Sequence, residues 1–365
     1  MEQEVTIKDI FKHYLSSVVI YGIILAIIVN CPVYYESIEH EYFNYIYFFI
    51  VYFLCYVFIA PIIYFTIKPK SVLESKSLAI VNYIVRQFKK PESTKEFLEN
   101  IEPKENEKQA MMILFIKTFF SVTCVNMLCN TLLPSLGYNF DFIGAISTTF
   151  IQYLKEGSGF WQNLCQYIID TGDMWIKLIL TATTLVLTFS YLTDTCLFKN
   201  KIKSADTTPL GVLSCIICYY PITILTSKFI TLSLETLIPV ENAIVLTILN
   251  VLIILVNFIG LLAVLRLFGK SGNLTNRGIV TGFPYNIIRH PSYTMQVLYI
   301  ILTSIPVCFV PAYSLGEKFS LWVGILIWIY IYYLRSITEE RHLIKDPEYQ
   351  KYVEKVKYRF IPKVF

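Results

Sequence analysis

Two polar patches near the carboxyl end of the chain hold the residues whose types and spacing could do chemistry. The first, residues 278–293, reads GIVTGFPYNIIRHPSY and connects two long apolar runs. Its glycines permit close approach of the backbone to a ligand, and Tyr285 and Tyr293 offer flat faces for stacking. The second, residues 335–340, reads RSITEE and closes the last apolar run. We expect the two patches to form one cofactor site at a membrane surface.

The Arg289-His290-Pro291 sequence marks the point where the polar connector enters an apolar run. Proline disfavours helix in the residue before it and suits the first turn of the helix that follows. His290 is therefore expected at a helix start, where free N–H groups favour an anionic ligand group. A helix cap beside an arginine that reaches toward water would explain the same residues.

In the second patch, Arg335 and Glu339 are four residues apart and share one face of a helix. A simple salt bridge predicts this spacing too. An arginine and two carboxylates at the inner edge of a span also make a site for a ligand that is both charged and lipidic. Glu340 is expected to point elsewhere, into solvent. The tail over residues 346–362 has an amphipathic pattern and is expected to fold back as a lid.

The composition places this site in a membrane protein. Of 365 residues, 55% are hydrophobic and only 16% are charged, and the apolar residues form runs of about 20. The expected fold class is all-α, a polytopic transmembrane helix bundle of about eight spans. Thr208-Pro209 reads as the cap and first position of the fifth span, and Pro221 should kink it. The expected spans cover residues 15–33, 43–67, 111–133, 174–198, 209–232, 243–265, 293–310 and 319–334.

The distribution of charge predicts the orientation. Lys and Arg gather in the amino terminus, in 68–110, 199–203 and 266–292, and in the tail, whereas the alternate loops carry glutamates. By the positive-inside rule, both termini and both polar patches are expected in the cytoplasm. The membrane would be the inner membrane in a bacterium or the endoplasmic reticulum in a eukaryote.

Two polar segments interrupt the spans. The cytoplasmic segment 68–110 holds an amphipathic pattern at 78–88, which fits a helix on an anionic membrane surface or one packed on the protein itself. The external insert 134–173 is expected to form two short interfacial helices separated by Gly157-Ser158-Gly159. We divide the chain into a membrane scaffold, 1–264, and a catalytic core, 265–365.

The remaining polar and sulfur-bearing residues suggest little chemistry. Most of the nine cysteines lie inside apolar runs, where cysteine behaves as a small hydrophobe. Cys215 and Cys218 form a C-x-x-C without a second pair or a nearby histidine, so we expect no metal site. Asn250 and Asn257 are expected to join helices. We expect no nucleic-acid partner.

Residues 265–365 contain several motifs whose order resembles that of a known family. They are Gly282-x-x-Tyr285 followed by Arg-His-Pro-Ser-Tyr, then Arg-x-x-x-Glu-Glu, then an ending with Arg-x-Ile-Pro. In this order they resemble the motifs of the integral-membrane isoprenylcysteine carboxyl methyltransferases. The related phospholipid N-methyltransferases share parts of this pattern. The resemblance implies an enzyme that binds S-adenosylmethionine from the cytosol and methylates a lipid or prenylated substrate presented from the membrane.

The resemblance also implies roles for individual residues. Arg335 matches the arginine that binds the substrate, and Arg289 matches a signature arginine whose role lies between substrate orientation and structure. Lys270 departs from the pattern, because it stands near an expected cofactor-contacting glutamine. The residues implied to bind the cofactor are Arg277, Gly278, Ile279, Val280, Tyr285, His290, Pro291, Ser292, Tyr293 and Glu339.

The residue inventory is consistent with this chemistry. Methyl transfer to a carboxylate is an in-line displacement whose nucleophile is already ionised near neutral pH, so it needs positioning and no general base. An amine acceptor would need a base, for which the chain offers little beyond His342.

Two other functions remain open. A membrane sterol or polyprenyl reductase that uses NADPH carries a similar Arg-His-Pro-x-Tyr element and ending, although it would show a different segment before the tail. A transporter or membrane-anchored binding protein would show ionisable residues deep in several spans, and we find essentially none at mid-span.

Overall fold

The computed structural model describes residues 4–31, 45–136, 141–155, 159–195, 197–227, 242–311 and 313–364. It confirms the all-α class. The only strands in these residues are β1 (Ser204–Ala205) and β2 (Thr275–Asn276), which pair antiparallel. Seven helical runs of the described residues are long and apolar enough to cross a membrane, so the chain is an integral, multi-pass membrane protein. The main helices of these runs are α1 (Ile7–Asn30), α3 (Tyr45–Ile67), α6 (Glu105–Met127), α9 (Phe160–Leu192), α12 (Ala243–Leu267), α13 (Pro291–Ser304) and α14 (Leu315–Leu343).

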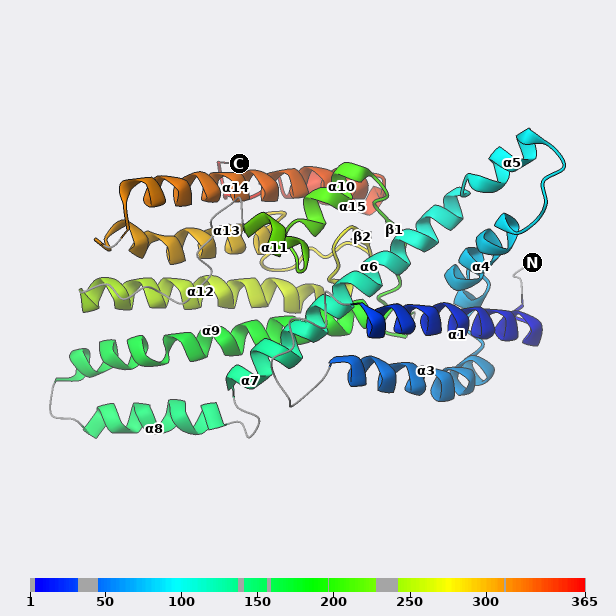
Figure 1. The fold of residues 1–365 in the computed structure, drawn as a ribbon. Helices are drawn as coiled ribbons and strands as arrows, with labels where there is room; N and C mark the ends of the chain where they lie inside the picture. The colour runs from blue at the N-terminus through cyan, green and yellow to red at the C-terminus, as the bar shows by residue number, and fades with distance from the viewer. Residues whose placement is uncertain are drawn as a thin grey trace.

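The long helices lie side by side in a bundle whose two ends differ (Figure 1). The first residues of α1 and the last residues of α14 lie at the same end, together with the ends of α9 and α12 and the start of α13. The short pair β1–β2 and α15 (Pro347–Lys355) also lie at this end. Polar segments that are distant in sequence therefore meet at one end of the bundle.

The expected fifth span is not a single long helix in the described residues. It consists of α10 (Pro209–Ile216) and α11 (Ile222–Ser227), and residues 228–232 lie outside the described part. The expected cap is confirmed, because the Gly211 amide donates to Thr208 Oγ1 at 3.3 Å. Pro221 has no amide hydrogen to donate within a helix. The expected kink is therefore an interruption: α10 ends at Ile216 and a new helix begins at Ile222. The described residues thus hold seven long spans, against about eight expected from the sequence.

The insert at residues 134–173 also differs from the expectation. Its first amphipathic stretch is α8 (Asp141–Lys155), as predicted, but the second is the first part of the 33-residue α9. Gly172 lies inside α9 without ending it. A Cβ built on Gly172 would lie 2.4 Å from Oδ1 of Asn250 on α12, so this glycine allows the two helices to approach closely.

The polar segment 68–110 packs partly on the bundle. One face of α4 (Lys76–Gln87) places Ile80 against Ile20 of α1 and Ala110 of α6. Arg86 and Glu107 join α4 to α6 with an ion pair of 2.7 Å. Ile84, Val85 and Phe88 remain exposed, so docking of this face on a membrane stays a prediction. The other short helical elements are Lys70–Val72, α5 (Thr94–Ile101), Leu128–Leu132, α7 (Leu133–Leu136), Phe268–Lys270 and Ile305–Cys308.

Candidate functional site

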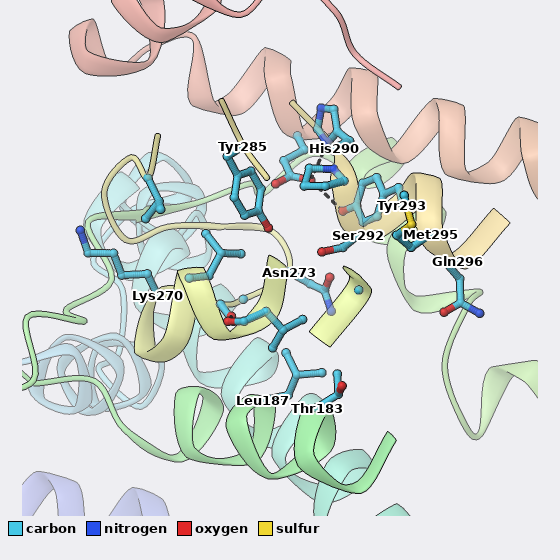
Figure 2. Close-up of a pocket in the computed structure, with 18 of the residues that line it drawn as sticks. Thr183, Leu187, Lys270, Asn273, Tyr285, His290, Ser292, Tyr293, Met295 and Gln296 are labelled. Carbon is cyan, nitrogen blue, oxygen red and sulfur yellow. Dashed lines mark hydrogen bonds and ion pairs between the residues drawn. The ribbon is translucent and has the colours of Figure 1, made fainter. Parts of the chain in front are cut away.

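A cavity of about 300 Å³ opens where α9, α12, α13 and α14 meet the connector between α12 and α13. All twelve residues that the sequence nominates for the site line this cavity. Figure 2 shows four of them, Tyr285, His290, Ser292 and Tyr293, among the lining residues. The twelve come from the connector, from the start of α13 and from the last turns of α14. They are Arg277, Gly278, Ile279, Val280, Tyr285, Arg289, His290, Pro291, Ser292, Tyr293, Arg335 and Glu339.

Arg277 fixes the connector to the scaffold. Its Nη1 donates to the backbone carbonyls of Thr193, Asn200 and Gly269 at 3.1, 3.1 and 3.2 Å. Burial lowers the pKa of this guanidinium. All three of these contacts use Nη1, and the buried Nε and Nη2 have no hydrogen-bond partner among the described residues.

Gly278 lies where the connector passes the cavity mouth. Its φ of +97° is a conformation that residues with a Cβ rarely adopt, and a Cβ here would lie 3.3 Å from Nζ of Lys270. Lys270 lines the same cavity, so the residue that departs from the family pattern nevertheless stands at the site. At this point the connector backbone can approach a ligand closely, and the Lys270 ammonium group lies beside it.

Pro291 starts α13 and His290 occupies the position before it, at the helix start as predicted, without a side-chain capping hydrogen bond. Tyr293 lies one turn into the helix, and its hydroxyl donates to Oε2 of Glu339 at 2.7 Å. The Glu339 side chain keeps 35% of its surface exposed, and its Oε2 lies 3.8 Å from Nδ1 of His290. Ser292 and Tyr285 line the same wall, and burial raises the pKa of the Tyr285 hydroxyl. These groups form the polar wall of the cavity.

The expectation that Glu340 points into solvent is wrong. Its side chain is only 13% exposed, and its carboxylate accepts hydrogen bonds from three cationic or titratable side chains. Arg289 Nε donates to Oε1 at 2.8 Å, His290 Nε2 lies 2.9 Å from Oε1, and Arg359 Nη2 donates to Oε2 at 2.6 Å. Glu340 therefore ties the connector, α14 and the tail together.

The contacts of Arg289 favour the structural one of its two expected roles. Besides Glu340, its Nη1 donates to the carbonyls of Val356 and Lys357 at 2.9 and 2.7 Å. The backbone amides of Arg289 and His290 donate to the carbonyls of Tyr358 and Arg359. The Arg289 guanidinium is thus committed to protein groups, even though the residue lines the cavity.

Arg335, unlike Arg289, has no carboxylate partner among the described residues. It is only 4% exposed, yet no carboxylate of the described residues lies within ion-pair distance of it. Its Nη2 donates to Asn273 Oδ1 at 2.9 Å and to the Tyr219 hydroxyl at 3.4 Å. The expected alternative of a plain salt bridge with Glu339 is therefore wrong.

Aromatic rings and sulfur atoms complete the surroundings of Arg335. The guanidinium carbon lies 4.7 Å from the ring centre of Tyr293, 5.2 Å from that of Tyr332 and 5.4 Å from that of Tyr219. The thiols of Cys215 and Cys218 also lie in its surroundings. A cation held only by neutral groups beside a cavity is prepared to receive an anion.

Sequence reasoning missed several of these residues. Asn273 and Tyr219 have no motif around them, and only the C-x-x-C sequence near Tyr219 signalled that α10 could matter. The described residues contain no cluster of three or more potential metal-ligating side chains. His342, the remaining candidate base, lies 3.1 Å from Ser204 Oγ and does not line the cavity.

The tail covers the polar end of the cavity, as its amphipathic pattern predicted. Tyr349 and Tyr352 of α15 pack with Tyr285 and Ala263 in one buried cluster. The Tyr352 hydroxyl donates to the Tyr285 carbonyl at 2.7 Å. The lid is therefore part of the folded site.

Away from the lid, the cavity continues between the long helices. Its walls there are mostly apolar and come from α9, α12 and α13. The apolar residues are Leu180, Leu187, Val256, Leu261 and Met295. The cavity thus has a polar end under the tail and an apolar end inside the bundle.

Comparisons with known proteins provide no family for the chain. Protein-family models, curated proteins and solved structures were each searched, and none of them matches.

Proposed function

We propose that this protein is an integral-membrane methyltransferase that moves a methyl group from S-adenosylmethionine to a lipid-borne carboxylate. The observation that carries the proposal is Arg335, a buried cation with neutral partners at the junction of the polar and apolar parts of one cavity. A buried charge without a counter-charge is costly. An acceptor carboxylate would supply that charge, and its lipid chain would occupy the apolar end. A phospholipid amine would not satisfy Arg335, so in a phospholipid acceptor the phosphate would have to pair with it instead.

The residues at the polar end fit S-adenosylmethionine. Tyr285 offers an aromatic face, whereas the Tyr293 ring is already in contact with His290 and Arg335. The partly exposed Glu339 is an acceptor for hydroxyl or amine groups. The positive φ of Gly278 leaves the backbone open to a close ligand. Lys270 at the mouth would attract a carboxylate. When bound, the cofactor would supply a methyl group on a sulfonium.

The chain's own residues would bind and orient the acceptor and the cofactor, and would exclude water from them. Arg335 would hold the acceptor carboxylate with its aromatic neighbours fixing the guanidinium. His290, held by Glu340, and Glu339, held by Tyr293, would line the cofactor side. The tail would keep water out, which favours a reaction in which opposite charges are neutralised. No general base is needed, because the carboxylate is already ionised.

The proposed membrane orientation follows from charge. The polar end of the cavity lies with the ends of α9 and α12 and the start of α13, where the Lys- and Arg-rich segments also lie. By the positive-inside rule this end would face the cytosol, together with both termini. The host membrane would be the bacterial inner membrane or the endoplasmic reticulum.

Calorimetry on detergent-purified protein tests the cofactor first. We expect S-adenosylmethionine to bind and NADPH not to bind. The substitutions His290→Ala and Glu339→Ala should each abolish cofactor binding. Binding of NADPH in place of S-adenosylmethionine would contradict the proposal and favour a reductase.

Methyl transfer to a farnesylated cysteine analogue tests the acceptor. Arg335→Ala should abolish transfer while cofactor affinity remains within about twofold, because the acceptor carboxylate is lost without a change in the cofactor wall. Arg341→Ala is the matched control, since Arg341 lies on the same helix and pairs with Asp206 away from the cavity. Transfer to phosphatidylethanolamine instead would contradict the carboxylate acceptor.

A further inference from the structure

A second, open pocket of about 380 Å³ lies where α9 and α12 end and the connector passes them. Four residues, Lys270 and Val280 among them, line both this pocket and the cavity described above, so the two are neighbours. The side chains that distinguish the second pocket belong to Lys199, Arg266 and two phenylalanines, and none of them has a part in the proposed reaction.

Three cationic side chains line this pocket, and none of its lining residues is acidic. Lys199 follows α9, Arg266 lies in the last turn of α12, and Lys270 comes soon after it. None of the three side chains makes an ion pair or a hydrogen bond with any residue that the structure describes. Like charges around one space repel one another, and an anion in that space would offset the repulsion.

Arg266 is held close to the connector by the absence of a side chain at Gly282. A Cβ built on Gly282 would overlap the Nη2 atom of Arg266, so only glycine leaves room for the guanidinium in this position. The guanidinium keeps all five of its N–H donors available there, in the planar fork that matches two oxygens of a phosphate. The pocket therefore contains a donor group with the geometry for a phosphate.

Two exposed aromatic rings complete the pocket. Phe198 is 55% exposed and Phe268 is 51% exposed, and both line the space beside the cations. The ring of Phe189 in α9 contacts both of them, with ring centres 5.2 Å apart in each case. Aromatic side chains at the end of a membrane span lie at the boundary between the hydrocarbon and the polar headgroups. A ligand that satisfies both parts of the pocket is anionic at one end and apolar at the other.

We propose that Lys199, Arg266 and Lys270 bind the phosphate of an anionic phospholipid, whose acyl chains lie against Phe198 and Phe268. Basic pockets between spans bind such headgroups on the cytoplasmic side, which is where the positive-inside rule would place this end of the bundle. A zwitterionic lipid carries its own ammonium group beside the phosphate, so the three cations favour a lipid with net negative charge. The site holds a lipid that is not consumed, and it does not depend on the proposed methyl transfer.

Native mass spectrometry of the detergent-purified chain tests the site, because each bound lipid adds a resolved mass. The probes are phosphatidylglycerol and phosphatidylcholine with identical acyl chains. We expect the tightest phosphatidylglycerol site to have an affinity about tenfold higher than that for phosphatidylcholine. Lys199→Gln and Arg266→Gln should each weaken phosphatidylglycerol about fivefold and leave phosphatidylcholine unchanged, as for the loss of one cation near an anionic headgroup. Lys270 is left intact because it also lines the first cavity.

Two further variants separate this pocket from the general charge of the surface. Lys68→Gln removes an exposed lysine just after α3, at the same end of the bundle but outside the pocket, and should keep the wild-type affinity. Gly282→Ala keeps every charge but places a Cβ where the Arg266 guanidinium lies, so it should weaken phosphatidylglycerol as Arg266→Gln does.

The outcomes distinguish the lipid from other sources of phosphate and from the proposed reaction. Equal affinities for the two lipids, or equal losses in Lys68→Gln and Lys199→Gln, would overturn the site. Calorimetry with glycerol 1-phosphate supplies the same phosphate without acyl chains. If it binds as tightly as phosphatidylglycerol, the ligand is a soluble phosphate and the lipid is excluded. Failure of S-adenosylmethionine to bind, with the lipid results as expected, would remove the proposed reaction and leave the lipid site standing.

Discussion

Glu340 and His290 come from segments 50 residues apart, and their side chains meet at 2.9 Å beneath the tail. The same carboxylate neutralises Arg289 and Arg359. Glu340→Gln would remove the only charge that compensates two largely buried guanidinium groups among the described residues. We expect a loss of about 3 kcal/mol in the free energy of unfolding and a parallel loss of cofactor affinity. Thermal unfolding in detergent measures the first and calorimetry the second.

Glu339→Gln is the adjacent control for Glu340→Gln. Glu339 is half-exposed and its hydrogen bond with Tyr293 can be kept by an amide oxygen. Cofactor affinity should fall while the unfolding temperature stays near that of the wild type. Equal unfolding temperatures for both variants would contradict the tying role of Glu340.

Asn273 is expected to decide whether Arg335 is free for an acceptor. Its amide oxygen accepts from Arg335 at 2.9 Å, and its Nδ2 donates to the Tyr219 hydroxyl at 3.0 Å. Asn273→Asp would place a carboxylate where the guanidinium already points, so this internal anion would compete with the acceptor. We expect the KM for a farnesylated cysteine analogue to rise at least about tenfold while cofactor affinity is kept.

The matched variant for this prediction is Asn273→Ala, which loosens Arg335 without pairing it. Its effect on KM should be smaller than that of the aspartate. If the two variants raise KM equally, competition by an internal carboxylate is not the cause.

Gly278→Ala tests the close approach of the connector. At a φ of +97°, alanine is strained, and its Cβ would lie 3.3 Å from Lys270 Nζ. We expect a cost of about 1–2 kcal/mol in stability and weaker cofactor binding. Gly144→Ala is the control, because a Cβ there meets no atom within 4 Å. Wild-type cofactor affinity in Gly278→Ala would argue against contact between this backbone and the cofactor.

The tail should be essential for cofactor binding. Removal of residues 356–365 would delete the carbonyl groups that pair with the Arg289 and His290 amides and the Arg359 partner of Glu340. We expect cofactor binding to be lost in a protein that still assembles its long helices, measured by calorimetry beside circular dichroism. A shorter truncation, after Ile361, spares these contacts and should bind normally.

The docking of α15 should depend on pH through Asp346. The hydrogen bond from Asn276 at 2.8 Å, with help from Lys203, holds the pKa of Asp346 below its ordinary value of 3.8. A carboxyl whose folded-state pKa is lowered stabilises the fold above its ordinary pKa, and this contribution disappears as the pH falls through the lowered value. Asp346→Asn should therefore unfold at a lower temperature than the wild type above about pH 5, with the difference shrinking as the pH falls toward 3. A pH-independent difference would exclude this carboxyl as its source.

The sequence by itself determined the class of fold and nominated twelve of the residues that line the cavity. A span must satisfy its backbone internally in lipid, so long apolar runs can only be helices, and the seven long helices follow them. Pro291 fixed the start of α13 through local sterics alone. Because the site residues cluster at the ends of consecutive spans, folding the bundle brings all twelve to one cavity.

Only the tertiary structure decided how those residues are paired. Arg335 and Glu339 have the spacing of a salt bridge, but Asn273, Tyr219 and Tyr293 come from other segments and hold them apart. Glu340 looked like a solvated neighbour because its partners lie in the connector and the tail. The spacing of residues along one helix shows only which side chains share a face. Which partner each of them takes depends on contacts between segments distant in sequence, which no local pattern contains.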